Sequence, residues 1–288
     1  MCEANVAFVI NRNYIGQFKV TFYSLVKANN NLNIFVHLLH SDLSDEDRAD
    51  INRFVNSYNA KINFYKIDDS FFEGLPKMGY DASYTAYYKV LVPYILGNLE
   101  KVLFLDCDII VRKSIKPLFE EDSNAFLSCV EDYKINRKRK SHKLKIIGDE
   151  KATYFNSGVM FFDFSKADGI APQEKVISYI AENKEVIRWH DQDILNHFYA
   201  KDCRLLDEKY NYLTTYKSVK DMFFPKGKKR AVIVHYANWK PWKSNYIGKY
   251  YGLYKSNYNA LKGEKCVDFL VKKSLKEQLK LIFKYLKR

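Results

Sequence analysis

The first 67 residues alternate between short continuous apolar runs and segments with helical spacing. The short runs predict strands that are buried on both faces, and the segments between them predict helices. One of these helices opens on a capping-box sequence from Ser44 to Asp47. Strands that alternate with helices in this way form parallel sheets with crossover helices. The predicted strands cover residues 4–11, 34–39 and 62–67, and the predicted helices cover residues 14–27 and 44–55.

The same alternation continues to about residue 245 without a linker rich in proline, glycine or serine and without an internal repeat. We therefore expect one α/β domain with a mostly parallel central sheet. Pro93 lies inside the predicted helix 83–96 and is expected to kink or end it. The further predicted strands cover residues 102–105, 125–130, 154–162 and 230–235, and the further helices cover residues 173–183 and 189–198.

Two aspartates, Asp106 and Asp108, follow the apolar run 102–105 directly. Residues two apart in extended backbone point the same way, so both carboxylates can face one point. Such a pair repels unless a proton or a cation lies between the groups, and a divalent ion with oxygen ligands meets that need. The other interpretation is that both are turn or strand-end residues, which the spacing alone does not exclude.

Other polar side chains also end predicted strands, namely Asn11, Glu131 and His235. Ligands of open α/β sheets bind outside the carboxyl ends of the strands. Asp106, Asp108 and His235 would together form a site of two carboxylates and one imidazole, which suits Mn²⁺ or a related ion such as Mg²⁺. Taken alone, His235 would be read as an ordinary strand-end or core histidine.

The net charge of +13 is concentrated in two segments of the 288-residue chain. Residues 134–145 hold seven basic residues and no acid, and residues 271–288 hold seven basic residues and one acid. The remainder is formally neutral, which argues against nucleic-acid binding along a basic groove. We expect residues 134–145 to form an excursion loop that folds over a donor, touches an anionic acceptor, or is simply solvated.

The five cysteines include no C-x-x-C pair, so neither a disulfide framework nor a zinc knuckle is indicated. We expect a cytoplasmic protein, because scattered cysteines without a disulfide framework suit a reducing compartment. No signal-peptide pattern is visible at residues 1–5, and no apolar run could span a bilayer. No G-x-G-x-x-G follows the first strand and no P-loop sequence occurs, which argues against a dinucleotide oxidoreductase and a P-loop NTPase.

Six sequence blocks, in this order, resemble the retaining family 8 glycosyltransferases of the GT-A fold, which use nucleotide sugars. The pattern is similar to that of bacterial lipooligosaccharide α-galactosyltransferases. The blocks are FVINRNY at 8–14, YYKVL at 87–91, VLFLDCD at 102–108, FNSGV at 155–159, HDQDILN at 190–196 and HYANWKPW at 235–242.

The resemblance implies that Asp106, Asp108 and His235 bind Mn²⁺, which bridges the diphosphate of a UDP-sugar. It also implies a hexosyltransferase that moves galactose or glucose to a glycan acceptor. Gln192 would face the anomeric carbon, with Asp191, Glu131 or Asp132 as the neighbouring carboxylates. Retention would follow a front-face route, or alternatively a covalent intermediate on Asp191 or a neighbouring carboxylate. The donor-binding residues would be Val9, Asn11, Asn13, Tyr14, Lys89, Cys107, Asn156, Asn238 and Lys240, together with Asp191, Gln192 and the three metal ligands.

Two departures from the family pattern leave the donor sugar open. The family often has Asp where Asn11 stands and usually has Arg where Lys89 stands, and these two basic side chains are not equivalent at a bidentate site. The stretch from His235 to Lys240 is also about one residue shorter than in the similar enzymes, so the family position that corresponds to Asn238 is not uniquely defined.

We expect residues 1–262 to form the catalytic domain and residues 263–288 to form a basic amphipathic tail. In 271–288 the apolar residues fall on one helical face with lysines elsewhere, which predicts binding to an anionic membrane surface and a peripheral position on the inner face of the cytoplasmic membrane. The alternative is that this stripe packs on the domain. Related enzymes also carry such tails, which implies a lipid-linked or membrane-proximal acceptor.

Two other functions are weighed against the hexosyltransferase. A sugar-nucleotide nucleotidyltransferase would carry an early glycine-rich activation loop, which the sequence lacks. A non-catalytic binder of an anionic polymer would spread basic residues along a groove, whereas here they are confined to two segments.

Overall fold

The computed structural model describes residues 2–75, 83–214, 230–237, 240–243, 250–267 and 269. The chain separates into two compact units that interleave along the sequence. The first unit consists of residues 1–12, 31–106 and 115–208, and the second consists of residues 13–30, 107–114 and 209–288. The two units are described separately.

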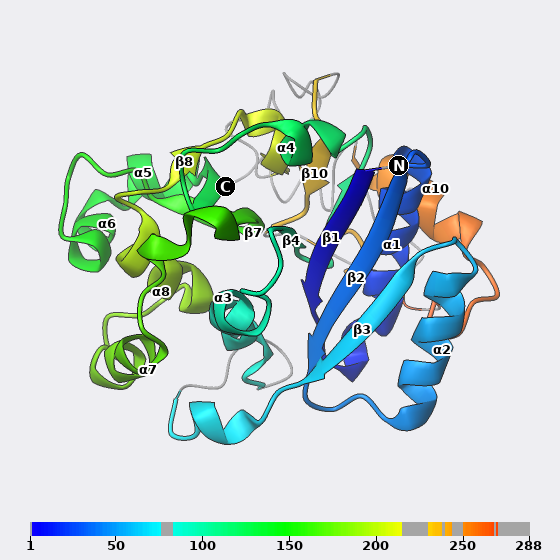
Figure 1. Cartoon of the computed structure of the whole chain (residues 1–288), viewed down its shortest axis with the longest axis horizontal. Coiled ribbons are helices and arrows are strands. Elements are labelled where there is room, and N and C mark those ends of the chain that lie inside the picture. Colours follow the sequence, from blue (N-terminus) through cyan, green and yellow to red (C-terminus); the bar gives the residue numbers. More distant parts are fainter. Residues whose placement is uncertain are drawn as a thin grey trace, which may run out of the picture. The chain divides into compact units, whose positions relative to one another are not determined.

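The first unit is built on a seven-stranded sheet with the order β3-β2-β1-β4-β7-β6-β8. All neighbouring strands pair in parallel except β7, which runs antiparallel to both β4 and β6. Figure 1 shows β1, β2 and β3 side by side. The mostly parallel α/β sheet predicted from the sequence is confirmed. The strands are β1 (Cys2–Val9), β2 (Leu32–His40), β3 (Lys61–Lys66), β4 (Lys101–Leu105), β6 (Leu127–Glu131), β7 (Phe155–Asp163) and β8 (Arg204–Leu205).

The reversed direction of β7 determines which residues meet at one edge of this sheet. Leu105 at the carboxyl end of β4 pairs with Val159, and Val130 near the end of β6 pairs with Asn156. The amide of Asp106 continues the ladder by donating to the carbonyl of Gly158 at 2.9 Å. The start of β7 therefore lies beside the ends of its two neighbours, and Asn156 belongs to the same edge as Asp106.

The helices of the first unit agree with the sequence where a capping signal or an apolar stripe is present. Ser44 and Asp47 form the predicted capping box: the Ser44 hydroxyl accepts from the Asp47 amide, and the Asp47 carboxylate accepts from the Ser44 amide, both at 3.1 Å. The helices are α2 (Asp45–Asn56), α3 (Val92–Ile95), α4 (Lys116–Glu120), α5 (Tyr133–Lys138), α6 (Lys140–Ile147), α7 (Gln173–Glu182) and α8 (His190–Tyr199).

Two local predictions were wrong. Residues 83–96 form a 3-10 helix (Thr85–Leu91) followed by the short α3, in which Pro93 occupies the first turn. Proline is tolerated there because the first turn needs no amide donor. Residues 134–145, expected as a loop, lie largely in α5 and α6, since Ile135, Ile146 and Ile147 are buried and hold both helices on the unit.

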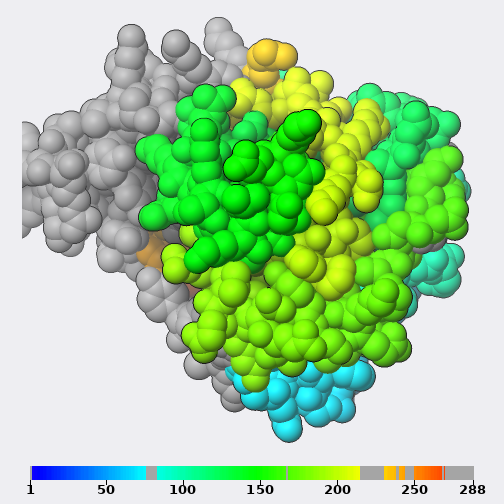
Figure 2. Space-filling model, turned by 90° about the vertical axis from the view of Figure 1, so that its left-hand side faces the viewer, coloured from blue at the N-terminus to red at the C-terminus, as the bar shows by residue number. Residues whose placement is uncertain are grey.

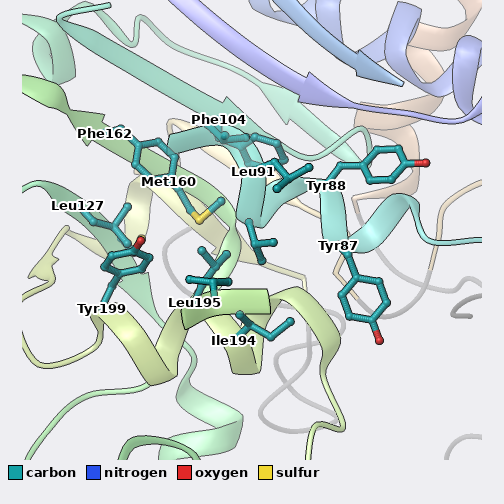
Figure 3. Close-up of a cluster of buried hydrophobic side chains, with 14 of the residues drawn as sticks. Tyr87, Tyr88, Leu91, Phe104, Leu127, Met160, Phe162, Ile194, Leu195 and Tyr199 are labelled. Carbon is teal, nitrogen blue, oxygen red and sulfur yellow. The ribbon is translucent and has the colours of Figure 1, made fainter. Parts of the chain in front are cut away.

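A continuous core joins the sheet of the first unit to α8 and the 3-10 helix (Figure 3). Phe104 of β4 and Met160 and Phe162 of β7 are fully buried and contribute to it. Leu195 lies on α8 in the same cluster, and Tyr87 and Tyr88 add the 3-10 helix to it. This packing fixes α8 and residues 85–91 against the sheet, so the polar residues that they carry are held in place.

The second unit contains a separate three-stranded sheet, β5-β10-β9. Its middle strand β10 pairs antiparallel with β5 and parallel with β9, with His235 opposite Ile109. The prediction that His235 ends a strand is confirmed, and that strand belongs to this second sheet. The elements of this unit are α1 (Ile15–Ala28), β5 (Ile109–Val111), β9 (Tyr212–Leu213), β10 (Ile233–His235) and α10 (Tyr251–Ala260).

Helix α1 holds the segment after the aspartate pair. The Thr21 hydroxyl lies 2.9 Å from the carbonyls of both Cys107 and Ile109, and the Ser24 hydroxyl accepts from the Val111 amide at 3.0 Å. These polar groups of α1 are buried, so their hydrogen bonds to backbone fix the course of residues 107–111.

The membrane-related predictions concern residues 271–288, which lie outside the described residues, and the proposed boundary at residue 262 stays a prediction. Among the helices that the structure does describe, none combines the length and the apolar character needed to cross a bilayer.

Candidate functional site

A lysine between two aspartates forms the centre of the polar edge of the first unit. The Nζ atom of Lys89 lies 2.8 Å from Oδ1 of Asp106 and 3.1 Å from Oδ2 of Asp191. Lys89 comes from the 3-10 helix, Asp106 follows β4, and Asp191 lies in the first turn of α8. Three elements that are distant in sequence thus bring one cation and two anions together.

This lysine stays charged despite its burial. Burial alone would lower the pKa of Lys89, but the negative charges of Asp106 and Asp191 outweigh it and hold the pKa above its usual value. Asp191 also accepts a hydrogen bond from the Ser157 hydroxyl at 2.6 Å. The Asp191 carboxylate is therefore held by a cation and a hydroxyl on the same oxygen.

Gln192, the next residue of α8, is oriented by contacts at both ends of its side-chain amide. Its Oε1 accepts from Nδ2 of Asn156 at 2.9 Å and from the amide of Ser157 at 3.2 Å. Its Nε2 donates to Oδ2 of Asp132 at 3.2 Å. The side chain is buried, so these bonds fix the direction of the amide plane.

Asp132 and Glu131 differ in their surroundings although they are neighbours. Asp132 is buried, and its Oδ1 caps α5 by accepting from the amides of Lys134 at 3.0 Å and Ile135 at 3.1 Å. Its other oxygen contacts Gln192. Glu131 is exposed at the end of β6. Of the two carboxylates considered from the sequence, Asp132 is the one that contacts Gln192.

A carboxylate that the sequence interpretation did not single out, Asp193, is the most enclosed of the group. Its side chain is fully buried, and Oδ1 accepts from the Tyr154 hydroxyl at 2.6 Å and lies 2.9 Å from Nε2 of His142. Its Oδ2 accepts from the amides of Arg188 and Trp189 at 2.7 and 2.9 Å. Asp193 therefore connects α6, the residue that precedes β7 and the entry of α8.

Ser157 was also missed, although it lies inside the FNSGV block. The signal that could have identified Ser157 and Asp193 is their position: each is next to, or two residues from, a residue that was selected. What the sequence could not give is the partner of each side chain, because those contacts join elements far apart in the chain.

In the second unit, Asp108 lies between an imidazole and an ammonium group. Its Oδ1 is 3.2 Å from Nε2 of His235, and its Oδ2 accepts a hydrogen bond from Lys240. The carbonyl of Asp108 accepts from the Tyr236 amide at 2.9 Å, which holds the residue beside β10. Burial would raise the pKa of Asp108, but Lys240 and His235 outweigh that effect and hold it well below its usual value.

The hydrogen bonding of His235 shows why a cation fits this position. Nδ1 of His235 lies 2.9 Å from Oδ1 of Asn211, an acceptor, so in the neutral imidazole Nδ1 carries the proton. Nε2 then presents a lone pair toward the Asp108 carboxylate. Two facing acceptors require a proton or a metal ion between them, and an imidazole oriented through its other nitrogen is the usual arrangement at metal sites.

Asp106, Asp108 and His235 also meet the distance requirement for a shared ion. One side-chain ligand atom of each lies within 4.8 Å of those of the other two. Two carboxylates and one imidazole match the ligand preferences of Mn²⁺ and, with its stronger oxygen preference, Mg²⁺. The residues present therefore fit a divalent ion.

The remaining predicted donor-binding residues lie at the carboxyl end of β1, before α1, between β4 and β5, and after β10. In the first unit, Val9 is half-buried and Asn11 is buried. In the second unit, Asn13 is exposed, Cys107 is buried and the ring of Tyr14 contacts Trp242 edge-on, with centroids 6.3 Å apart. Asn238 lies outside the described residues.

Comparison with known proteins identifies the family. The model of glycosyl transferase family 8 matches residues 5–246. A putative glycosyltransferase of Haemophilus influenzae is 26% identical over 212 residues, which cover 73% of this chain and 64% of that protein. The lipopolysaccharide 1,2-glucosyltransferase of Escherichia coli K12 is 26% identical over 267 residues, which cover 88% of this chain and 78% of that protein. This chain thus spans less than two thirds of the Haemophilus relative.

Solved structures agree in fold. The galactosyltransferase LgtC, solved with donor and acceptor sugar analogs, superposes with a TM-score of 0.75 at 21% identity, covering 96% of this chain and 99% of its own. The glycosyltransferase GlyE of Streptococcus pneumoniae superposes with a TM-score of 0.64 at 19% identity, covering 99% of this chain and 64% of its own. With the family model matching most of its length, the chain belongs to glycosyltransferase family 8.

Proposed function

We propose that this protein is a metal-dependent retaining hexosyltransferase that moves galactose or glucose from a UDP-sugar to a glycan acceptor. The observation that carries the proposal is the convergence of Asp106, Asp108 and His235 on one point, in a chain of this family. A diphosphate leaving group needs a compensating positive charge, which a divalent ion held by these three residues would supply.

In this proposal Asp106, Asp108 and His235 would hold Mn²⁺, and the ion would supply Lewis-acid chemistry at the diphosphate leaving group. Lys240 contacts Asp108 in the structure and supplies a second positive charge for a phosphate oxygen. Val9, Asn11, Asn13, Tyr14, Cys107 and Asn238 are assigned to the nucleotide, as the resemblance implies. These six assignments rest on the family pattern alone.

The sugar itself is assigned to the polar edge of the first unit. Lys89, Asn156, Asp191 and Gln192 form one connected set of hydrogen bonds and ion pairs there. Such buried and mutually oriented groups suit recognition of sugar hydroxyls, which both donate and accept.

Retention of configuration is best explained by a front-face route. The amide of Gln192 is a poor nucleophile, and its Oε1 already accepts two hydrogen bonds. Asp191 is held by Lys89 and Ser157, which lowers its nucleophilicity, and both oxygens of Asp193 accept hydrogen bonds. We therefore assign Gln192, Asp191 and Asp132 to stabilising a short-lived oxocarbenium-like species, in place of a covalent adduct. Exposed Glu131 has no such contact among the described residues.

The acceptor is proposed from the relatives. The relatives include a lipopolysaccharide 1,2-glucosyltransferase and a lipopolysaccharide 1,3-galactosyltransferase, the latter 24% identical over 264 residues. A cell-surface glycan, lipid-linked or membrane-proximal, is the corresponding acceptor for this chain, and a cytoplasmic location follows from the UDP-sugar donor.

The test measures UDP release from UDP-galactose and UDP-glucose with Mn²⁺, with Mg²⁺ and after chelation. We expect turnover with a divalent ion only, and a loss of at least about 100-fold in Asp108→Asn, in line with the removal of one electrostatic contact to the leaving group. Asp50→Asn on α2 is the matched control, because Asp50 is also buried. Metal-independent turnover, or an unchanged Asp108→Asn enzyme, would reject the assignment.

A further inference from the structure

Helices α5 and α6 carry a dense cluster of basic residues. Of the seven basic residues in 134–145, six have exposed side chains. None of these six forms an ion pair with any acidic residue that the structure describes. The α5–α6 basic surface is defined by Lys134, Arg137, Lys138, Arg139, Lys140 and Lys145.

The seventh basic residue, Lys143, behaves differently and shows that the exposure of the others is selective. Its side chain is buried, and its ammonium donates to the carbonyls of Glu150 and Ala152 at 2.7 and 2.8 Å. Lys143 fastens α6 to the following loop. Within the described part of the chain, the side chains of the six exposed cations make no hydrogen bond of this kind.

Some of these charges work against helix stability, whereas Arg137, Lys138 and Lys145 lie in last turns, where the helix dipole favours positive charge. Lys134 is four residues from Lys138 and three from Arg137 in α5, and like charges at these spacings destabilise a helix. Arg139 and Lys140 stand at the start of α6, where the helix dipole disfavours positive charge. Apart from the stacking of Arg137 on Tyr133, no contact among the described residues compensates for these charges, which points to a function for them.

The surface also carries an exposed apolar side chain. Leu144 is 41% exposed, and only three large hydrophobic side chains of the described residues are exposed to this degree. It follows Lys143 and precedes Lys145 on α6. In Figure 2 the green residues of α5 and α6 form a raised area that faces the viewer. A convex surface with cations around an apolar side chain suits contact with a lipid headgroup layer.

We propose that the α5–α6 basic surface docks the protein on an anionic lipid leaflet. Each lysine or arginine near such a leaflet is attracted to it, and an exposed leucine among them adds an apolar contact at the interface. Nucleic acid fits less well, because the six cations are not interleaved with aromatic side chains; Tyr133, over which Arg137 stacks at 4.4 Å, is the aromatic residue of these two helices.

This surface is connected to the sugar-binding edge of the same unit by two contacts. Asp132 caps α5 with one oxygen and accepts from Gln192 with the other. His142 of α6 contacts the Asp193 carboxylate of α8. If the proposed function holds, docking through α5 and α6 would present the sugar site to an acceptor at the membrane surface.

The experiment measures flotation of the full chain with vesicles of phosphatidylcholine alone and of phosphatidylcholine mixed with phosphatidylglycerol, at low and high salt. The test variant combines R137E, K138E, R139E and K140E. The control variant makes the same change of charge at four exposed lysines elsewhere on the first unit, K61E, K66E, K175E and K201E. A second test variant with glutamine at the same four positions guards against a folding defect in the first, and thermal melting reports on all of them.

We expect recovery with anionic vesicles to fall at least about tenfold in both test variants at low salt, since four attractive contacts are lost. The control should float as the parent does, and neutral vesicles should recover none of the proteins. Equal flotation of the test and control variants would overturn the proposal. It would also be overturned if the test variants lost binding to heparin, a soluble anionic polymer, but still floated with anionic vesicles. UDP release measured in solution, without vesicles, reports separately on the proposed function.

Discussion

The Nζ atom of Lys89 lies 2.8 Å from Oδ1 of Asp106. This contact joins the first aspartate of the D-x-D pair to the sugar-binding edge, because the same ammonium lies 3.1 Å from Asp191. Asp106 is thus shared between the proposed metal site and a buried lysine. The positive charge of Lys89 offsets two carboxylates that would otherwise repel each other at close range.

Replacing Lys89 should lower turnover strongly. In Lys89→Met the cation is lost while much of the side-chain volume is kept, and we expect kcat to fall about 100-fold, the scale for loss of one oriented charged contact. Lys89→Arg should retain more activity than Lys89→Met, with an altered preference between UDP-galactose and UDP-glucose. UDP release with each donor measures both effects.

Lys101→Met is the matched control for this series. The Lys101 ammonium donates to the carbonyls of Phe119 and Glu121 at 3.1 and 3.3 Å, at the amino end of β4 and therefore at the opposite edge of the sheet. Equal losses of kcat in Lys89→Met and Lys101→Met would show that the effect is structural.

The parts of the fold that sequence patterns predicted are those encoded locally. The run 102–105 is continuously apolar because β4 is covered on both faces, and the capping box at Ser44 requires only residues within one turn. The direction of β7 was not predictable, because an apolar run reads the same in either direction. That direction is what brings Asn156 to the site.

In the candidate site, too, residues recognisable from local sequence were predicted, whereas contacts between distant parts of the chain were not. Asp106 and Asp108 could be selected because residues two apart in extended backbone point the same way, so the spacing alone indicates that both carboxylates can face one point. The bonds from Asp193 to His142 and Tyr154 join residues 51 and 39 positions apart. Residues 134–145 were predicted to be a loop because they are mostly basic. The buried isoleucines in and next to this segment pack on the unit, and the residues form helices.

Removing the N-cap of α2 should destabilise the first unit modestly. Ser44→Ala deletes the hydroxyl that accepts from the Asp47 amide at 3.1 Å, and loss of such a cap costs about 1 kcal/mol. Chemical denaturation should show a lower free energy of unfolding with unchanged kcat, because α2 lies outside the proposed machinery. Asp45→Asn, also in the first turn but without a capping bond in the structure, should have a smaller effect.

His37 should make stability depend on pH. Burial lowers the pKa of His37 to about 4, and its nitrogens contact the Tyr65 hydroxyl at 2.9 Å and Oδ1 of Asn5 at 3.1 Å. Between pH 6.5 and 4 the unfolded chain binds a proton that the folded chain does not. Stability from this group is therefore complete above its ordinary pKa and is lost as the pH falls, by up to about 3 kcal/mol.

The measurement for His37 is the free energy of unfolding as a function of pH in the parent and in His37→Gln. Glutamine cannot titrate, so the variant should lose less stability than the parent between pH 7 and 4. Parallel curves for the two proteins would contradict this expectation.

Asp193 distinguishes a structural carboxylate from a nucleophile. All four contacts of its carboxylate are with groups of the protein, and its side chain is fully buried. Asp193→Asn places an amide donor against the amides of Arg188 and Trp189 or against Tyr154, so we expect a loss of stability of about 3 kcal/mol. Turnover of Asp193→Asn should fall only to the extent that the loss of these contacts displaces α8. His142→Asn should also lower the free energy of unfolding, by a smaller amount.

The two measurements for Asp193→Asn are thermal or chemical unfolding and the rate of UDP release at a temperature where the variant is folded. A structural role predicts a destabilised variant with measurable turnover. A nucleophile predicts the reverse: an unchanged melting curve with turnover abolished, which would also reject the front-face route. Because Asp193 lies two residues beyond Asp191 on the same helix, Asp191→Asn provides the comparison, with turnover falling at least as far and stability less affected.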